Sequence, residues 1–455
     1  MEARAIVIVT QVSIRCRRTY IPMPRSRMDG ETPMNSSSLR ALRAPAACLL
    51  SAVLSWLAPH ALAASDEIFA SGFQPLGYAI PLASPDGADY LYTAQVTVGD
   101  QTFAMDIDTG SATLAVAGAT CTAGCTGISP LYTPSASAAS TGHTVSSLYA
   151  DGSGWSGSTY SDTVGLGNGS PSVSLDLVEI THATGGFFDS NNGYQGILGL
   201  GTQGLAQQYT AGFIPVVVVG TGLDNTFAFD LCDTTGANAG TMWLGGDGGA
   251  GSMQYTPLVP IDGSNPFYAI NVDGMSLGGV SIATNAASTF QQPVLDTGTS
   301  LFYVPTSVYV AFKTALQASA GFKAVFGSNA FSGSDCVADA SVTDDEVESM
   351  LPQIALSLPN VISSEPGVTI QASALDTYLY NAGGGQYCLA LQDGGTVDPS
   401  TFGDAFMQAF HTVIDVDGGR VGFAPPTGCP APAAMHRILR PARIGPHRHP
   451  RPPRP

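Results

Sequence analysis

Apolar and polar residues alternate in short runs along much of this chain, and glycine-rich turns separate the runs. Residues 90–98 form one such run, Gly99 and Asp100 give a two-residue hairpin signal, and residues 101–107 form the next run. Residues 147–160 repeat the pattern as two extended arms around a Gly/Ser-rich tip. The alternation predicts β-hairpins in the first half of the chain.

Helical periodicity is strongest at residues 307–317. Val308, Phe312 and Leu316 fall on one face of a 3.6-residue repeat, and Pro305 stands just before the segment. Only 11% of the residues are charged and 53 are Gly, which is typical of many strands and tight turns. We therefore expect an all-β fold with few helices.

The two ends of the chain differ from its body. Residues 34–63 resemble a secretory signal peptide, with arginines, an apolar run over residues 46–58 and a small-residue cleavage site. About thirteen apolar residues are too few to cross a bilayer comfortably, so we expect a secreted protein, extracellular or periplasmic, without a stable membrane anchor. Residues 1–33 lie outside this pattern and suggest a start codon set too far upstream. Residues 431–455, rich in Pro, Arg and His, predict a disordered tail.

Charge is distributed very unevenly. Residues 64–430 contain 32 acidic residues and three basic ones, Lys313, Lys323 and Arg420. Such a surface repels nucleic acid and anionic membranes, so neither is expected as a partner. Self-repulsion falls when carboxylates are protonated, which favours a protein adapted to acid. The simpler interpretation is an acidic surface that serves solubility alone.

One short phrase occurs twice, 188 positions apart. Residues 106–111 read Asp-Ile-Asp-Thr-Gly-Ser, and residues 294–299 read Val-Leu-Asp-Thr-Gly-Thr. Each phrase ends an apolar run, and each is followed downstream by an apolar stretch punctuated by Gly, at residues 196–201 and 401–406. The repetition suggests an old duplication that gave two lobes related by a pseudo-two-fold axis. The Asp of each triplet would then meet its counterpart at the seam.

A pair of carboxyl groups can hydrolyse a peptide bond without a metal, a cofactor or an activated Ser or Cys. Two carboxyls a few ångströms apart do not easily ionise together, so they share one proton. One member can take a proton from water while the other gives one to the leaving nitrogen, without a covalent intermediate. The titration belongs to the pair and not to either residue.

With these motifs, the chain resembles the pepsin-type aspartic endopeptidases over about residues 90–429. The sequence at residues 229–232, 267–274 and 420–425 is similar to that of the plant, nepenthesin-like branch of this family. The resemblance implies a bilobal, pepsin-like acid protease fold, with a cleft between two pseudo-two-fold-related β-rich lobes. It also implies a monomeric enzyme that cuts protein or peptide substrates at acidic pH without a cofactor.

The resemblance divides the chain and assigns the site residues. Residues 64–84 form a short N-terminal segment, residues 85–254 an N-terminal β lobe with the first triplet and a flap, and residues 255–430 a C-terminal β lobe with the second triplet. The implied site consists of the catalytic Asp108 and Asp296, the supporting Thr109, Gly110, Ser111, Thr297, Gly298 and Thr299, and the flap residues Tyr149, Asp151, Gly152 and Ser153.

The supporting residue types have physical reasons. Gly110 and Gly298 let the backbone turn tightly where a side chain would crowd the carboxylates. By the resemblance, the two threonines cross-bond the loops beneath the aspartates. Ser111 and Thr299 can donate hydroxyl groups to carboxylate oxygens, which favours the charged form.

The chain departs from the family pattern at several positions. Ala115 stands where many relatives carry a Trp that hydrogen-bonds the flap tyrosine, and Ala150 replaces the Gly after that tyrosine. Trp155 is expected to fill part of the space. His411 stands where relatives usually have Tyr, and we expect a packed histidine there, not a catalytic one.

Eight cysteines are present, and Cys16 and Cys48 precede the body of the chain. The other six are an even set that predicts three disulfides in an oxidising compartment, and the sequence alone allows fifteen pairings. A metal site at Cys121 and Cys125 would need a second Cys or His pair at ligand spacing, and none is near in the sequence. The resemblance implies the pairs Cys121–Cys125, Cys232–Cys429 and Cys336–Cys388.

Three other functions fit parts of the pattern. A non-catalytic pepsin-fold binding or inhibitor protein would usually lack one Asp or a flanking residue, and both triplets are intact. A glycosidase also uses two carboxylates, but that function would not explain the repeated Asp-Thr-Gly. A serine hydrolase would need a Gly-x-Ser-x-Gly elbow with a supporting histidine, and His143, His182 and His411 lack that context.

Overall fold

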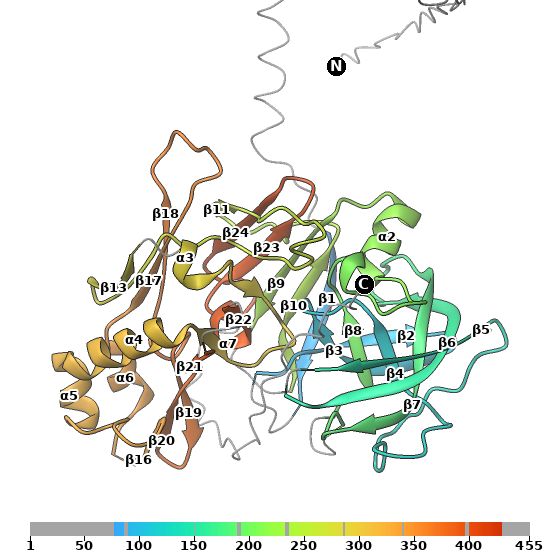
Figure 1. Ribbon diagram of the computed structural model, residues 1–455, viewed down its shortest axis with the longest axis horizontal. Helices are drawn as coiled ribbons and strands as arrows, with labels where there is room; N and C mark the ends of the chain where they lie inside the picture. The colour runs from blue at the N-terminus through green and yellow to red at the C-terminus, as the bar shows by residue number, and fades with distance from the viewer. Residues whose placement is uncertain are drawn as a thin grey trace, which may run out of the picture. The chain divides into compact units, whose positions relative to one another are not determined.

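The structure is a computed structural model that describes residues 77–85, 90–149, 151–188, 193–232, 236–284, 287–338, 341–395 and 400–429. The predicted extension at residues 1–33, the leader at residues 34–63 and the tail at residues 431–455 lie outside these ranges, as does Ala150. Strands dominate the described residues, and the helices are few (Figure 1). The predicted all-β fold is confirmed.

The elements follow one another in two halves. The first half contains β1 (Tyr78–Ser84), β2 (Thr93–Val98), β3 (Gln101–Asp108), β4 (Leu114–Ala117), β5 (Ala139–Leu148), β6 (Gly154–Gly165), β7 (Val173–Thr184), β8 (Gly196–Gly199), the 3-10 helix η1 (Gln203–Leu205), α2 (Phe213–Thr221), β9 (Thr226–Leu231) and β10 (Gly236–Leu244). The second half contains β11 (Gln254–Pro257), β12 (Gly274–Leu277), β13 (Val280–Thr284), α3 (Ala287–Phe290), β14 (Val294–Leu295), β15 (Phe302–Val304), α4 (Thr306–Ala318), α5 (Ala320–Phe326), β16 (Cys336–Ala338), α6 (Asp344–Met350), β17 (Ile354–Leu358), β18 (Val368–Ala372), β19 (Leu379–Gly383), β20 (Gln386–Leu389), β21 (Leu391–Asp393), β22 (Thr401–Phe402), α7 (Asp404–Met407), β23 (His411–Asp415) and β24 (Arg420–Ala424).

The hairpin predicted before the first triplet is present. Strands β2 and β3 pair antiparallel, and Val98 lies opposite Gln101 across the two-residue turn. Phe103, Met105 and Ile107 alternate along β3 and are fully buried, as the period of two requires. Strand β3 pairs with β2 on one side and with β8 on the other. Its last residue therefore belongs to a strand that is hydrogen-bonded on both sides.

The two halves repeat one strand arrangement. In the first half, β8 pairs parallel with β3 and antiparallel with β4, and β4 pairs parallel with β7. In the second half, β22 pairs parallel with β14 and antiparallel with β15, and β15 pairs parallel with β21. Strands β8 and β22 lie in the two Gly-punctuated stretches that follow the triplets in the sequence. The repeated pairing supports the predicted duplication.

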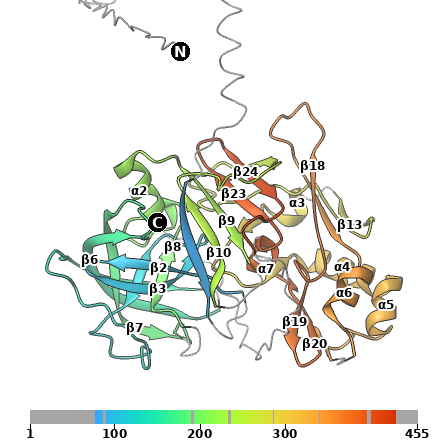
Figure 2. The ribbon, with the colours of Figure 1, turned by 180° about the vertical axis from the view of Figure 1, so that it is seen from behind.

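A single sheet joins the two halves. Strand β9 pairs antiparallel with β23, with Phe229 opposite Thr412, and the order β11-β24-β23-β9-β10-β1 continues into the first half. Figure 2 shows β23 and β24 running beside β9 and β10. The boundary expected between residues 254 and 255 falls at the start of β11, which pairs with β24. The two halves are therefore joined by the backbone hydrogen bonds between β9 and β23.

The predicted helix is also present. Helix α4 runs one residue beyond the expected segment at each end. Val308, Phe312 and Leu316 are buried on the face that the periodicity predicted. None of the described helices is long and apolar enough to cross a membrane.

Three disulfides are present in the described residues, and they are the pairs that the resemblance implied: Cys121–Cys125, Cys232–Cys429 and Cys336–Cys388. Cys232 follows β9 and Cys429 follows β24, so this bond ties the end of the described chain to the shared sheet. Cys336 and Cys388 lie opposite each other across β16 and β20.

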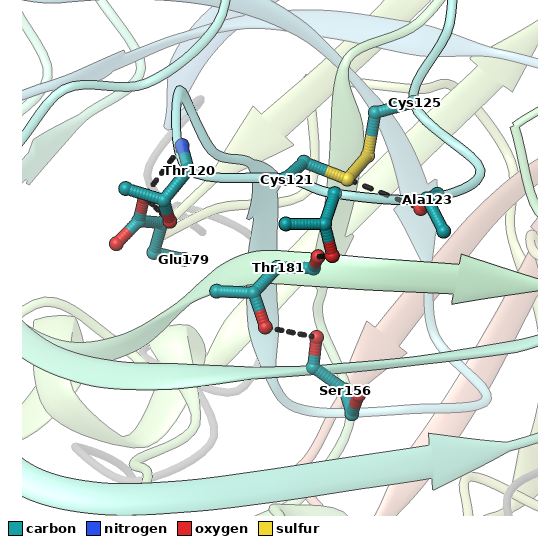
Figure 3. The surroundings of a disulfide bond; sticks show 8 residues. Thr120, Cys121, Ala123, Cys125, Ser156, Glu179 and Thr181 are labelled. Atoms are coloured by element: carbon teal, nitrogen blue, oxygen red, sulfur yellow. Dashed lines mark hydrogen bonds between the residues drawn. A yellow bond between two sulfur atoms is a disulfide. The ribbon is translucent and has the colours of Figure 1, made fainter.

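The short Cys121–Cys125 loop packs against β7 (Figure 3). The hydroxyl of Thr120 donates to Oε1 of the buried Glu179 at 2.6 Å. The Thr181 hydroxyl donates to the backbone carbonyl of Ser156 at 3.3 Å, which ties β7 to β6. Backbone hydrogen bonds hold the loop itself on β7, from the N–H of Thr122 to the carbonyl of Thr181 and from the N–H of Ala183 to the carbonyl of Ala123, both at 2.9 Å.

We expect the Cys232–Cys429 bond to contribute most of the disulfide stabilisation, because it joins residues 197 positions apart. Replacing both cysteines with Ala should lower the free energy of unfolding by about 2–5 kcal/mol. The matched change of Cys121 and Cys125, four positions apart, should cost roughly 3 kcal/mol less, since closing a short loop removes less chain entropy. Denaturant unfolding of both variants measures the difference, and equal losses would contradict it.

Candidate active site

The two Asp-Thr-Gly triplets lie at the ends of equivalent strands. Asp108 is the last residue of β3, and Asp296 directly follows β14. Each strand pairs with a parallel neighbour, β8 or β22. Both aspartates are buried, with 4% and 2% of their surface exposed. The repeated sequence therefore has a repeated geometry.

Two threonines cross-link the triplets beneath the aspartates. The backbone N–H of Thr109 donates to Oγ1 of Thr297 at 3.1 Å, and the N–H of Thr297 donates to Oγ1 of Thr109 at 3.0 Å. Each hydroxyl then donates across the seam, from Thr109 to the carbonyl of Leu295 at 2.8 Å and from Thr297 to the carbonyl of Ile107 at 2.7 Å. Four buried hydrogen bonds thus fix the distance between the two loops.

The Asp108 carboxylate is held by its own loop. Oδ1 accepts the backbone N–H groups of Gly110 at 2.7 Å and of Ser111 at 3.1 Å. Oδ2 accepts the hydroxyl of Ser111. Three donors therefore fix the plane of this carboxyl group, and its rotamer is set before any substrate binds.

The Asp296 carboxylate is held in the same way. Oδ1 accepts the backbone N–H of Gly298 at 2.9 Å, and Oδ2 accepts the hydroxyl of Thr299 at 2.6 Å. Thr299 thus occupies the place that Ser111 has in the first loop. Both carboxyl groups are oriented by the residues that follow them in the sequence.

Each carboxylate also lies against the glycine of the other triplet. A Cβ atom added at Gly110 would lie 2.5 Å from Oδ1 of Asp296, and one added at Gly298 would lie 2.5 Å from Oδ1 of Asp108. A residue with a side chain would displace the opposite carboxylate at either position. The two aspartates therefore meet at the seam, and the glycines are what lets them approach.

Burial and proximity change the acidity of the pair. Burial, followed by the charge of the Asp296 carboxylate, raises the pKa of Asp108 to about 7, although the hydrogen bond from Ser111 acts to lower it. Burial also raises the pKa of Asp296, and the hydrogen bond from Thr299 lowers it by a smaller amount. Two carboxyls in contact do not easily ionise together, so the pair retains a proton well above the usual range.

Two further carboxyl groups lie close to the pair, and the sequence motifs did not identify them. Asp106, on β3, and Asp404, at the start of α7, are 5% and 1% exposed. Oδ1 of Asp106 and both side-chain oxygens of Asp404 have no hydrogen-bond partner in the described part of the chain. Burial, followed by the charges of the neighbouring aspartates, raises the pKa of both groups well above the ordinary value. An acidic residue inside an apolar run was the available signal at both positions.

The predicted flap is a tight turn between β5 and β6. The N–H of Tyr149 donates to the carbonyl of Ser153 at 2.8 Å, and the N–H of Gly152 donates to the carbonyl of Tyr149 at 3.1 Å. Oδ1 of Asp151 accepts the N–H of Ser153 at 2.8 Å. Burial, followed by the charge of Asp108, raises the pKa of Tyr149. The flap tyrosine therefore lies within electrostatic reach of the first aspartate.

His411 does not belong to this site. Its ring is fully buried on β23, with Nδ1 2.9 Å from Oδ1 of Asp230 and Nε2 2.7 Å from the carbonyl of Asp247. Asp230 also accepts the N–H of Gly428 at 2.8 Å. The expected packed histidine is confirmed, and it helps to bind the end of the described chain to the shared sheet.

The chain is similar to known proteins over most of the described residues. The family model described as eukaryotic aspartyl protease matches residues 91–426. An aspartic protease of Phaffia rhodozyma is 29% identical over 342 residues, which cover 74% of this chain and 77% of that protein. Aspergillopepsin-1 of Aspergillus oryzae is 28% identical, over 75% of this chain and 80% of that protein. Secreted aspartic protease 8 of Candida albicans is 29% identical, over 73% and 75%. These fungal relatives do not test the similarity to the plant, nepenthesin-like branch, which stays a prediction.

The raised pKa values predict a fold that is more stable in acid than at neutral pH. A carboxyl whose pKa is higher in the folded state contributes stability below its unfolded pKa, near 3.8, and that contribution is lost as the pH rises through the folded pKa. The midpoint temperature of thermal unfolding should therefore decrease as the pH rises from about 4 to 7.5. Asp404→Asn should raise the midpoint at pH 7.5 by a few degrees, because a neutral amide carries no buried charge.

Asp262 gives the matched control for this prediction. It is exposed, and hydrogen bonds from Ser264 lower its pKa. Asp262→Asn should therefore bring no gain at pH 7.5. A thermal midpoint that rises equally in both variants, or that does not depend on pH in the unmodified protein, would contradict the buried-charge account.

Proposed function

Because this chain belongs to the eukaryotic aspartyl protease family and is an aspartic-type endopeptidase, we propose that Asp108 and Asp296 together hydrolyse its peptide substrates. The observation that carries the proposal is the crossed pair of threonine hydrogen bonds. These bonds keep two separate loops at a fixed distance, with each carboxylate against the opposite glycine. No other pair of aspartates in the described residues is held in this way by repeated sequence.

In the proposed reaction, the pair starts with one shared proton. The ionised carboxyl takes a proton from a water molecule, whose oxygen attacks the carbonyl carbon, and the neutral carboxyl donates its proton to the carbonyl oxygen. In the tetrahedral intermediate, the pair again holds one proton, which passes to the leaving nitrogen as the C–N bond breaks. The pair recovers the remaining hydroxyl proton as the new carboxyl group forms. Neither aspartate makes a covalent bond to the substrate.

The electrostatics support activity in acid. Lys313 and Arg420 form ion pairs with Asp335 and Asp415, at 2.8 Å in both cases. Lys323 donates to the backbone carbonyl of Ala318 at 3.0 Å, so none of these three basic groups pairs with the aspartates of the site. Protons, not cations, must therefore offset the charge of the four buried carboxyls. We expect turnover at acidic pH that declines as the pH rises through about 7, where the pair of carboxyls loses its shared proton.

The remaining parts of the proposal concern the flap and the location of the enzyme. Tyr149, Asp151, Gly152 and Ser153 would close over an extended peptide, and the apolar cluster around Tyr149 favours apolar side chains beside the cleaved bond. We propose that the enzyme is exported and acts as a monomer. The leader-like residues 34–63 support export, as does the similarity to secreted aspartic protease 8 of Candida albicans.

Cleavage of denatured casein at pH 3–7 tests the proposal. Asp108→Asn and Asp296→Asn should each lower kcat by at least about 10³-fold, since each removes one partner of the proton exchange. Asp100, exposed in the turn before β3, provides a matched control, and Asp100→Asn should leave kcat unchanged. Substantial turnover in either site variant would contradict the shared pair. Folded protein that cleaves nothing across this range would instead favour a non-catalytic binding protein.

A further inference from the structure

Two exposed aromatic rings lie against each other in the first half of the chain. The rings of His143 and Tyr209 are stacked, with centroids 3.7 Å apart and planes 6° apart. His143 lies on β5, the strand that leads into the flap, and Tyr209 lies in the loop between η1 and α2. We propose that this stacked pair is a subsite that binds an acidic side chain of the peptide substrate. The proposal names a substrate class for the proposed function and rests on that function.

Both rings of the stacked pair are carried by irregular backbone. The register of β5 against β6 shifts between Ser140 and Thr144, so β5 contains a bulge at His143. A bulge changes the direction of a side chain relative to a regular strand. Tyr209 has a φ of 66°, which residues other than Gly adopt rarely and at a cost in free energy. Irregular backbone on both sides of one contact indicates that the surrounding structure maintains this contact.

The loop that carries Tyr209 is attached to the segment after the first triplet. The hydroxyl groups of Thr210 and Thr113 form a hydrogen bond of 3.0 Å. Earlier in the same connection, the Thr202 hydroxyl donates to the backbone carbonyl of Pro266, in the second half, at 2.6 Å. The loop therefore lies beside the seam at which the two triplets meet.

His143 reaches this loop from the base of the flap. It precedes Tyr149 by six residues, which corresponds to about 20 Å along an extended strand. The flap turn is held within its own hairpin, because Nε1 of Trp155 donates to the Tyr149 hydroxyl at 3.1 Å. An extended peptide beneath the flap would therefore reach the stacked pair three or more residues from the cleaved bond, and on one side of that bond only.

The stacked pair presents unused hydrogen-bond donors to solvent. His143 is exposed, and Tyr209 is 48% exposed. Within the described residues, neither the ring nitrogens of His143 nor the Tyr209 hydroxyl has a hydrogen-bond partner. In acid an exposed imidazole is protonated, so both of its nitrogens donate, and the face of a phenol ring favours a cation stacked on it. A carboxylate, which only accepts hydrogen bonds, complements these donors.

The charge of the rest of the chain makes the stacked pair distinctive. The three basic residues between residues 64 and 430 bind other groups, as described above. Of the three histidines in the described residues, His411 is buried beside Asp230, and His182 is exposed on β7 and stacks on no described ring. An acidic peptide that approaches the described surface is therefore repelled over most of it and attracted at His143.

Paired peptides that differ at one position test the subsite. Asp or Asn is placed in turn at each position three or more residues from the cleaved bond of an otherwise uncharged substrate. At about pH 5, peptide carboxyls are ionised and exposed imidazoles are protonated. The Asp peptide should then have a kcat/KM about 2- to 5-fold higher at positions on one side of the bond, the gain expected from one exposed charge pair. The ratio should approach one in about 0.5 M NaCl, which screens exposed charges.

Substitutions separate charge recognition from a purely structural contact. His143→Gln should bring the ratio between the Asp and Asn peptides to one, and His143→Lys, which keeps the positive charge, should retain part of it. His182→Gln is the matched control and should keep the full ratio. If His143 only holds the base of the flap, His143→Gln would slow both peptides equally and leave the ratio as it was. That result, or a ratio of one in the unmodified enzyme, would overturn the proposal.

The same peptides distinguish the failure of this proposal from the failure of the proposed function. Equal cleavage of both peptides by an enzyme that depends on Asp108 would refute the subsite alone. Protein that cleaves neither peptide would refute the proposed function, and binding of the two peptides then tests the subsite. The Asp peptide should bind more tightly than the Asn peptide and lose this advantage in His143→Gln, whereas equal binding would refute the subsite as well.

Discussion

The crossed hydrogen bonds between Thr109 and Thr297 are the contact on which the active site depends. Each triplet alone provides one buried carboxylate, and a buried carboxylate without a partner is costly. The four bonds among Thr109, Thr297, Leu295 and Ile107 are buried and join segments almost 190 residues apart. Because each threonine both donates and accepts, the loss of one hydroxyl affects both loops. The geometry of the pair is therefore a property of the interface and not of either half.

The rest of the fold supports that interface. The repeated arrangement of β3, β8, β4 and β7 and of β14, β22, β15 and β21 delivers both triplets from equivalent strand ends. The shared sheet, in which β9 pairs with β23, fixes the halves to each other through backbone hydrogen bonds. The Cys232–Cys429 bond and the His411–Asp230 contact then attach the end of the described chain to the same sheet. Rigid elements thus carry the site, as preorganised electrostatic catalysis requires.

Features encoded by neighbouring residues could be predicted from the sequence. The hairpin before Asp108, the helix around Phe312 and the two triplets each depend on local periodicity or on a repeated phrase. The roles of Asp106 and Asp404 could not be predicted, because an acidic residue in an apolar run becomes significant only when its burial and neighbours are known. The same holds for Trp155: its sequence position places it on the flap, but only the pairing with β5 and β7 directs its N–H toward Tyr149. The strand ladder that crosses the predicted lobe boundary likewise depends on pairing between distant segments.

The most direct test of the central claim is a kinetic double-mutant cycle on the crossed threonines. Thr109→Val and Thr297→Val each keep the side-chain shape and remove the hydroxyl, whereas the matched Thr→Ser changes keep the hydroxyl. If the crossed bonds set the distance between the carboxylates, each Val variant should lower kcat roughly 10²-fold, as expected when reacting groups are displaced. The double variant should lose much less than the product of the two effects, and the Ser variants should remain close to the unmodified enzyme. Small, multiplicative effects of the two Val substitutions would show that the pair is positioned by something else and would contradict the account.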